Sequence, residues 1–260
     1  MKQKKHKKNA AKSLFQEWSS QNENCLIGCS HDCKYCYAKA DAIRFKRTTP
    51  QQWKNEVVRT QMLHKRFTKK SGRIMFPSSH DITPPHLFEC LTFLEHILRP
   101  GNEVLIVSKP HLDCVKAICG ELAGYKEQVL FRFTIGSSDS ATLKFWEPNS
   151  PDFAERLESL KYAFSEGYQT SVSCEPMLDD NVGDVISQVS PFVTDTIWLG
   201  TMYSPIARLK LNGELTPATK KLADELIKKQ SDEFIRNLYS QHGGKPQIRW
   251  KGVIKKVLGL

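Results

Sequence analysis

Short apolar runs separated by amphipathic stretches dominate the chain between residues 73 and 201. The apolar runs predict five strands, at residues 73–76, 103–108, 128–136, 169–174 and 196–200. The stretches between them have apolar side chains at helical spacing and predict helices over 85–100, 111–122, 151–167 and 179–192. Parallel strands are joined by such helices through right-handed crossovers. The pattern therefore predicts an α/β fold.

The segment before residue 73 completes this series. Residues 23–27 predict a short first strand, and residues 37–45 and 51–67 predict helices. Thr83 before Pro84, and Ser150 before Pro151, are typical of helix starts. About six β/α units result, too few for an eight-unit barrel, and no G-x-G-x-x-G turn follows the first strand. We expect a partial (β/α)6 TIM-type barrel with a C-terminal helical extension.

The two ends of the chain depart from this rhythm. Residues 1–20 are rich in lysine and predict a disordered basic tail, whereas residues 21–201 form the predicted barrel core. Residues 202–260 predict a helical extension packed on that core, with one long helix over 216–241 and a turn with a short segment over 243–252.

Basic residues gather at both ends and account for much of the formal net charge of +10. They are Lys2, Lys4, Lys5, Lys7, Lys8 and Lys12 at one end, and Lys245, Arg249, Lys251, Lys255 and Lys256 at the other. Such clusters favour an anionic partner, DNA or RNA first. A solvated tail that only aids solubility has the same composition, so the tail leaves both interpretations open.

The chain lacks the apolar segments that membranes and secretion require. No run of 18 apolar residues occurs, and no apolar stretch follows the basic N-terminus. Eight cysteines in such a chain predict reduced thiols plus a site rather than a disulfide framework. We therefore expect a cytoplasmic protein without a membrane partner.

Three cysteines crowd into the stretch "GCSHDCKYCYA", with the spacing C-x3-C-x2-C. They are Cys29, Cys33 and Cys36. A structural zinc site needs four ligands, and Cys25 or His31 is the candidate fourth. A four-iron cluster held by three thiolates keeps one iron open for another ligand. The chain has no second C-x-x-C pair, which favours a cluster over zinc, and uncoordinated thiols are the third alternative.

This motif, with Tyr35 before the last cysteine, resembles that of the radical SAM superfamily. The further blocks "FPSSHD", "VSKP", "FRFTIGS", "FWEP" and "SCEPML" resemble the spore photoproduct lyase-like, or "DNA repair photolyase", radical SAM proteins over about residues 22–205. The resemblance implies a [4Fe–4S] cluster that reductively cleaves S-adenosylmethionine to a 5′-deoxyadenosyl radical. It also implies an electron donor such as flavodoxin or ferredoxin.

The resemblance assigns roles to residues of the matching blocks. Cys29, Cys33 and Cys36 would bind the cluster; Tyr35 would lie near the adenine, Ser79 near the methionine part, Lys109 at the carboxylate of S-adenosylmethionine, Thr134 near the ribose and Glu175 at a ribose hydroxyl. The alternative for Lys109 is that it lies on the surface and binds no cofactor. Ser78 stands where the photoproduct lyases have a cysteine that donates hydrogen, so we do not predict dimer repair.

Other polar residues follow the predicted strands, and barrels of parallel strands have their catalytic residues at these carboxyl ends. His80, Asp81 and Cys174 are the candidate catalytic residues among them. Asp81 could equally cap a turn, and Cys174 could lie in the core. Two classes of function stay open: a radical SAM enzyme acting on a nucleic acid, a peptide or a small molecule, and a nucleic-acid-binding module with a structural zinc site.

Overall fold

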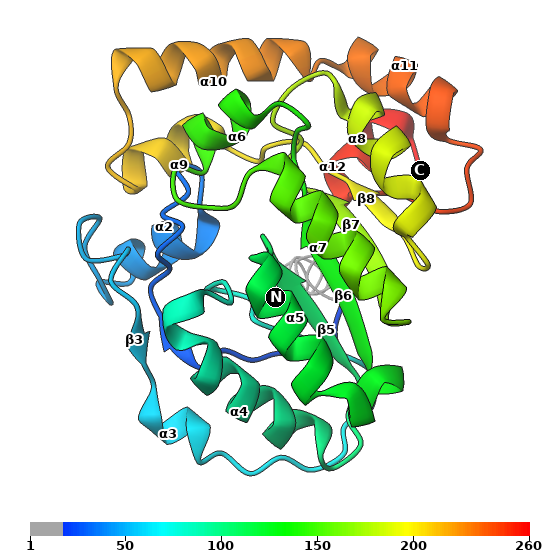
Figure 1. Ribbon diagram of the computed structural model, residues 1–260. Helices are drawn as coiled ribbons and strands as arrows, with labels where there is room; N and C mark the ends of the chain where they lie inside the picture. The colour runs from blue at the N-terminus through cyan, green and yellow to red at the C-terminus, as the bar shows by residue number, and fades with distance from the viewer. Residues whose placement is uncertain (1–17) are drawn as a thin grey trace, which may run out of the picture.

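The computed structural model describes residues 18–260, and a curved sheet of seven parallel strands forms its centre (Figure 1). The strand order is β1-β4-β5-β6-β7-β8-β9. The strands are β1 (Gln21–Asn22), β4 (Ile74–Phe76), β5 (Val104–Ser108), β6 (Val129–Thr134), β7 (Gln169–Cys174), β8 (Ile197–Leu199) and β9 (Ile248–Trp250). Adjacent strands pair in parallel throughout, which confirms the predicted α/β fold of the partial-barrel type.

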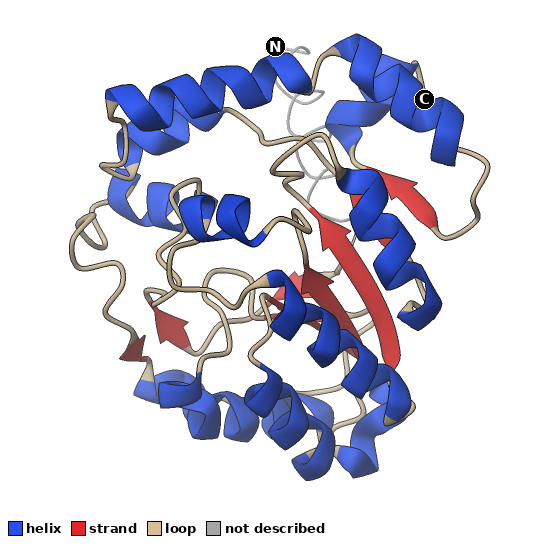
Figure 2. Cartoon of the chain, turned by 45° about the horizontal axis from the view of Figure 1, so that its top comes forward, coloured by secondary structure: helices blue, strands red, loops and turns tan. Residues whose placement is uncertain are grey.

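Helices cover the outer face of this sheet, as Figures 1 and 2 show from two directions. The crossovers are η1 (Pro84–His86), α4 (Leu87–Leu98), α5 (Leu112–Glu121), η2 (Ala123–Gln128), α6 (Ser140–Trp146), α7 (Phe153–Ser165), α8 (Val182–Val189) and η3 (Ser190–Phe192). The remaining elements are α2 (Tyr37–Arg44), α3 (Thr60–Leu63), α9 (Pro205–Leu211), α10 (Pro217–Lys229), α11 (Asp232–His242) and α12 (Gly252–Leu258), with the antiparallel pair β2 (Leu26–Ile27) and β3 (Val57–Val58).

The two faces of the sheet differ in chemistry. Phe131 and Phe133 of β6 are fully buried in the core beneath the helices, so alternation along the strand turns Arg132 and Thr134 to the inner face. Arg132 pairs in register with Ser171 of β7, which therefore shares its face. Burying each phenyl ring is worth about 3–5 kcal/mol against alanine. The outer face thus drives folding, while the inner face is free to carry polar groups.

Three of the predictions for the chain before α4 need correction. Of the strand predicted at 23–27 only residues 26–27 form a strand, β2, which pairs with β3 outside the main sheet, whereas the first strand of the main sheet is β1, just before the predicted range. Of the helix predicted over 51–67 only the short α3 forms: the valines before it make β3, and Trp53 packs against Cys29. Thr83 does not cap a helix, since its hydroxyl donates to Glu56 at 2.8 Å.

Two predicted helix boundaries further along are also corrected. Asp152, not Ser150, caps α7 by accepting a hydrogen bond from the backbone N–H of Glu155. The long helix predicted over 216–241 is two helices, because the Ser231 side chain caps the start of α11 by accepting from Phe234. Helix α6 was not predicted.

The C-terminal segment also completes the sheet. Strand β9 pairs in parallel with β8, so the sheet has seven strands where six were predicted.

The N-terminal lysines up to Lys12 lie outside the described residues. No helix between residues 18 and 260 has the length and apolar character needed to cross a membrane.

Candidate functional site

The three cysteines of the motif lie on one loop, next to Asp81 and Lys109, which follow β4 and β5. Cys29 and Cys33 are buried and Cys36 is partly buried. Burial raises the pKa of each thiol, and for Cys29 the negative charge of Asp81 and of the two other cysteines raises its pKa further. The surroundings of all three thiols therefore favour their protonated form.

A tight turn shapes the loop that carries these thiols. Gly28 has φ +90°, and a Cβ atom there would lie 2.6 Å from the carbonyl oxygen of Trp53. The backbone N–H of Cys29 donates to that same oxygen at 2.9 Å. Cys36 caps α2, where its sulfur accepts from the backbone N–H of Lys39 at 3.4 Å. Only glycine tolerates both the positive φ and the close approach at residue 28.

The loop between α9 and α10 holds the far side of the cysteine loop. The side-chain amide of Asn212, which is buried, donates to the carbonyl oxygens of Lys34 and Cys36 at 2.9 and 3.0 Å. Glu214 lies 3.4 Å from both Lys34 and Lys39. Buried Lys39 also pairs with Asp32 at 2.7 Å. Residues from the C-terminal extension thus fix the shape of the motif.

Asp81 lies at the centre of a second set of bonds. Its carboxylate accepts from the hydroxyl of Ser108, from the backbone N–H of Lys109 at 2.9 Å and from that of Ile82 at 2.8 Å, and it lies 3.2 Å from His31. Burial alone would raise the pKa of Asp81, but His31, Lys109 and Ser108 hold it well below its usual range. The carboxylate therefore joins β4, β5 and the cysteine loop.

His80 has both ring nitrogens occupied. Nδ1 lies 2.8 Å from the carbonyl oxygen of Asp81, and Nε2 accepts from the backbone N–H of Cys25 at 3.2 Å.

The sulfur of Cys25 lies 3.8 Å from that of Cys90, while His31 Nε2 lies 2.8 Å from His111. Both candidates for a fourth zinc ligand, Cys25 and His31, therefore have other partners.

A buried charge network lies behind Tyr35 and Lys109. Glu147, at the end of α6, accepts from the Tyr35 hydroxyl and from Arg156 of α7, and it lies 3.9 Å from the Lys109 ammonium. Arg156 also donates to the carbonyl oxygen of Thr134 at 3.1 Å. Burial lowers the pKa of Lys109, but Cys33, Tyr35 and Glu147 outweigh it and raise that pKa well above its usual value. Lys109 is thus an inward-facing cation, not a surface residue.

Sequence reasoning missed Glu147 and Arg156 as site residues. Both are fully buried, and a paired buried charge is costly unless its position matters. Glu147 belongs to the block "FWEP", which was a usable signal. Arg156 lies in an amphipathic helix and belongs to no sequence motif that would indicate a role in the site.

The loop after β4 is organised by Asn24. Its side-chain oxygen accepts from the backbone N–H groups of Ser78 and Ser79, both at 2.8 Å, and its amide donates to the Ser78 hydroxyl. Within residues 18–260 the hydroxyl of Ser79 forms no hydrogen bond. It is therefore available at the mouth of the barrel.

Glu175 and Cys174 differ in position although they are adjacent. Glu175 follows β7 and lies 3.3 Å from Lys251, beside Gly200, where a Cβ atom would approach its side chain to 2.9 Å. Cys174 is fully buried in the core, and burial raises its pKa to about 12. Alternation along β7 puts Ser173, not Cys174, on the inner face, so the structure places Cys174 outside the site.

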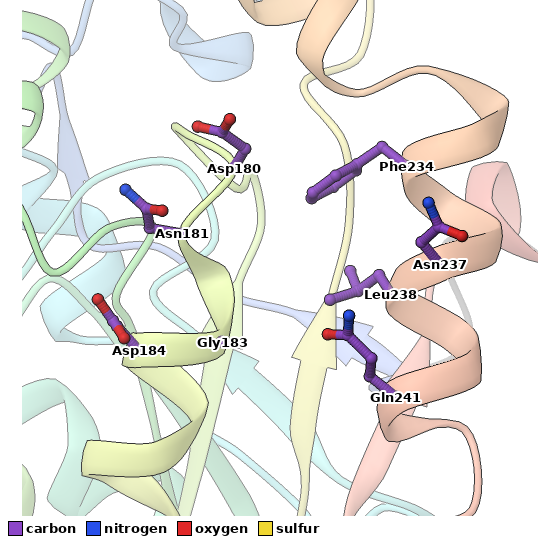
Figure 3. A pocket seen from close by; sticks show the side chains of 8 residues that line it. All are labelled: Asp180, Asn181, Gly183, Asp184, Phe234, Asn237, Leu238 and Gln241. Carbon is purple, nitrogen blue, oxygen red and sulfur yellow. The ribbon is translucent and has the colours of Figure 1, made fainter.

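A separate hollow of about 400 Å³ lies between the start of α8 and α11 (Figure 3). Asp180, Asn181 and Asp184 line one side, and Phe234, Asn237 and Gln241 line the other. It contains none of the predicted site residues. The candidate site is therefore the mouth of the barrel.

The three thiols of the loop are the donor set that iron–sulfur clusters use. Within residues 18–260 no three His, Cys, Asp or Glu side chains lie close enough together to hold a single metal ion. Because metal coordination ionises a thiol, a metal group bound here would have to overcome the raised pKa values of Cys29 and Cys33.

No family model matches the chain. It is 26% identical over 182 residues to the uncharacterized protein ORF301 of Acidianus two-tailed virus, with 65% of this chain and 59% of the virus protein covered. The chain thus spans less than two thirds of that relative.

Solved structures resemble the chain more extensively. A spore photoproduct lyase variant with bound AdoMet and dinucleoside spore photoproduct has a TM-score of 0.54 at 13% identity, covering 88% of this chain and 75% of that one. SuiB of Streptococcus suis, bound to precursor peptide SuiA, has a TM-score of 0.55 at 12% identity, covering 98% and 55%. Both are radical SAM enzymes. The chain therefore has the fold of the radical SAM enzymes, as the sequence resemblance predicted.

Proposed function

We propose that the protein is a radical SAM enzyme in which Cys29, Cys33 and Cys36 hold a [4Fe–4S] cluster. The observation that supports the proposal is the C-x3-C-x2-C loop beside Asp81 and Lys109, in a fold shared with radical SAM enzymes. When bound, the cluster and S-adenosylmethionine supply a 5′-deoxyadenosyl radical that takes hydrogen from a substrate. An electron donor such as flavodoxin or ferredoxin is part of the proposal.

The residues of the chain have defined tasks in this proposal. The Lys109 ammonium, held near Glu147, would bind the carboxylate of S-adenosylmethionine, since a charge-assisted hydrogen bond is strong where water is excluded. The unpartnered hydroxyl of Ser79 would bind its methionine part, and Tyr35 would form a wall beside the adenine. Thr134 and Glu175 would lie along the ribose.

His80 and Asp81 fit a different role from the catalytic one. Both ring nitrogens of His80 and both oxygens of Asp81 already have partners within the protein. They would keep the β4 loop, Lys109 and the cysteine loop in fixed relation. A group that must accept or give a proton needs a free position toward the substrate.

The substrate is proposed to be a nucleic acid, with a peptide or small molecule as alternatives. The spore photoproduct lyase above binds a dinucleoside and SuiB binds a peptide, so both kinds occur on this fold. The net charge of +10 favours the polyanion. Ser78 lies where the photoproduct lyases have their hydrogen-donating cysteine, so dimer repair is not proposed. A zinc-binding module is less well supported, because Cys25 and His31 are engaged elsewhere.

Anaerobic reconstitution with iron and sulfide tests the proposal. We expect a brown protein that forms 5′-deoxyadenosine from S-adenosylmethionine once it is reduced. The variant with all three motif cysteines replaced by alanine serves as the negative control, and Cys114→Ala, a buried thiol of α5, as the matched one. A colourless protein that binds one zinc and forms no 5′-deoxyadenosine would refute the proposal.

A further inference from the structure

Three large aromatic side chains are exposed beside the mouth of the barrel. Tyr37 and Phe45 stand at the two ends of α2, and Tyr203 follows β8. Their exposed fractions are 46%, 59% and 62%. Tyr37 and Phe45 flank one helix, and that helix contacts α9, which begins two residues after Tyr203. Exposed rings that gather on neighbouring elements mark interaction surfaces more often than rings scattered singly.

Guanidinium groups lie over two of these rings. Arg47 and Arg44 lie 5.1 and 5.9 Å from the centre of the Phe45 ring, and Arg208 lies 5.6 Å from that of Tyr203. None of these three arginines forms an ion pair with another of residues 18–260. The surface therefore presents flat apolar faces next to positive charges that no carboxylate neutralises.

These residues form one strip that ends at the site. Tyr37, Asp41, Arg44 and Phe45 are spaced as one exposed face of α2. Helix α2 packs beside α9, which carries Arg208 (Figure 1). The Tyr37 hydroxyl donates to the carbonyl oxygen of Ser78, just after β4. Asp41 is the one acidic residue of this α2 face, and three arginines outnumber it.

We propose that this strip, formed by Tyr37, Arg44, Phe45, Arg47, Tyr203 and Arg208, binds single-stranded nucleic acid. Bases that are free of a duplex can stack on exposed rings, while arginines contact the phosphates between them. An acidic peptide would use the arginines but would gain little from the rings. The inference deepens the proposed function, because it brings a nucleotide to the mouth where the radical would form.

Fluorescence anisotropy with a fluorescein-labelled 15-nucleotide oligothymidylate tests this inference on the full, reconstituted chain. Phe45→Ala and Tyr203→Ala should each weaken binding about tenfold, as loss of one stacked base does. Arg44→Gln and Arg47→Gln should each lower the log–log salt slope by about 0.7. Phe164→Ala is the control: this ring is 40% exposed but lies at the end of α7, just before the amino end of β7 and away from the carboxyl ends of the strands, so binding should not change.

Two results would overturn the inference. One is unchanged binding in both ring variants; the other is displacement of the oligonucleotide by polyglutamate at equal charge concentration, which would show attraction by charge alone. Iron content and S-adenosylmethionine cleavage are measured on the same preparations. Ring-independent binding with intact cleavage would refute this inference alone, whereas absence of cleavage in every preparation would refute the proposed function.

Discussion

The side-chain amide of Asn212 donates a hydrogen bond to the carbonyl oxygen of Cys36, over 3.0 Å and 176 positions of sequence. The same amide donates to Lys34, so it holds the backbone on both sides of Tyr35. The proposed ligand loop is therefore shaped by the C-terminal extension as well as by its own turn at Gly28. This relationship and the networks around it lead to four predictions.

Alanine in place of Cys29, Cys33 or Cys36 should abolish iron binding. A three-thiolate site has no spare ligand, so the loss of one leaves a second iron open. Iron analysis and the broad visible absorbance of the reconstituted protein measure the effect. Cys25→Ala should keep its iron, because the Cys25 sulfur lies beside Cys90 and not in the motif. Full iron retention in Cys33→Ala would contradict the assignment.

Asn212→Ala should loosen the cysteine loop without removing a ligand. It leaves two carbonyl oxygens without their donor, at a cost of about 1–3 kcal/mol for each buried group left unpaired. We expect faster loss of iron to a chelator and a lower free energy of unfolding. Asn212→Asp, which also lacks the donor, should behave alike, whereas Asn237→Ala on exposed α11 should match the unmodified protein. Equal rates of iron loss to the chelator in the unmodified protein and the three variants would show that Asn212 does not hold the cysteine loop.

Lys109→Ala should weaken the binding of S-adenosylmethionine. A charge-assisted hydrogen bond contributes about 1.5–3 kcal/mol, or roughly a 10- to 150-fold change in Kd. Equilibrium dialysis of the reconstituted variant gives the value, with Lys116→Ala on the exposed side of α5 as the control. An unchanged Kd in Lys109→Ala would mean that this cation serves only the Glu147 network.

Asp81→Asn should destabilise the protein in a manner that depends on pH. The pKa of Asp81 is held below its usual range by its surroundings in the folded state, so its stabilising effect is full above the unfolded pKa of about 3.9. That effect disappears as the pH falls through 3.9 toward the folded pKa. Urea unfolding of the metal-free protein should show a difference of about 3–5 kcal/mol at pH 7 that shrinks below pH 4. A difference independent of pH would show that the charge of Asp81 is not involved.

Strands β4, β5, β6 and β8 could be predicted because each is a mainly apolar run, whereas the more polar β7 could be predicted from its place in the alternation of strands and helices. The region from 51 to 67 could not, although its apolar residues follow a helical stripe. Trp53 is used to cover Cys29, and the valines of β3 are used to pair with β2. Distant partners decided this segment, and a local pattern does not contain them.

In the candidate site, too, contacts between residues far apart in the sequence could not be predicted. The motif cysteines follow β2, Ser79 follows β4 and Lys109 follows β5, while the roles that the resemblance assigns to them stay predictions. The pairing of Tyr35 with Glu147 joins residues 112 positions apart, and Glu147 meets Arg156 across the segment that links α6 to α7. Neither contact follows from spacing in the chain.

The position of Asn212 has a consequence for the order of events on the ribosome. Synthesis runs from the N-terminus, so the cysteine motif emerges more than 170 residues before the amide that clamps it, and strand β9 follows later still. A nascent chain therefore displays all three thiols long before their loop is fixed. Stable cluster insertion should wait until translation has passed Asn212, and chains that stop short of this residue should carry the motif yet fail to retain iron.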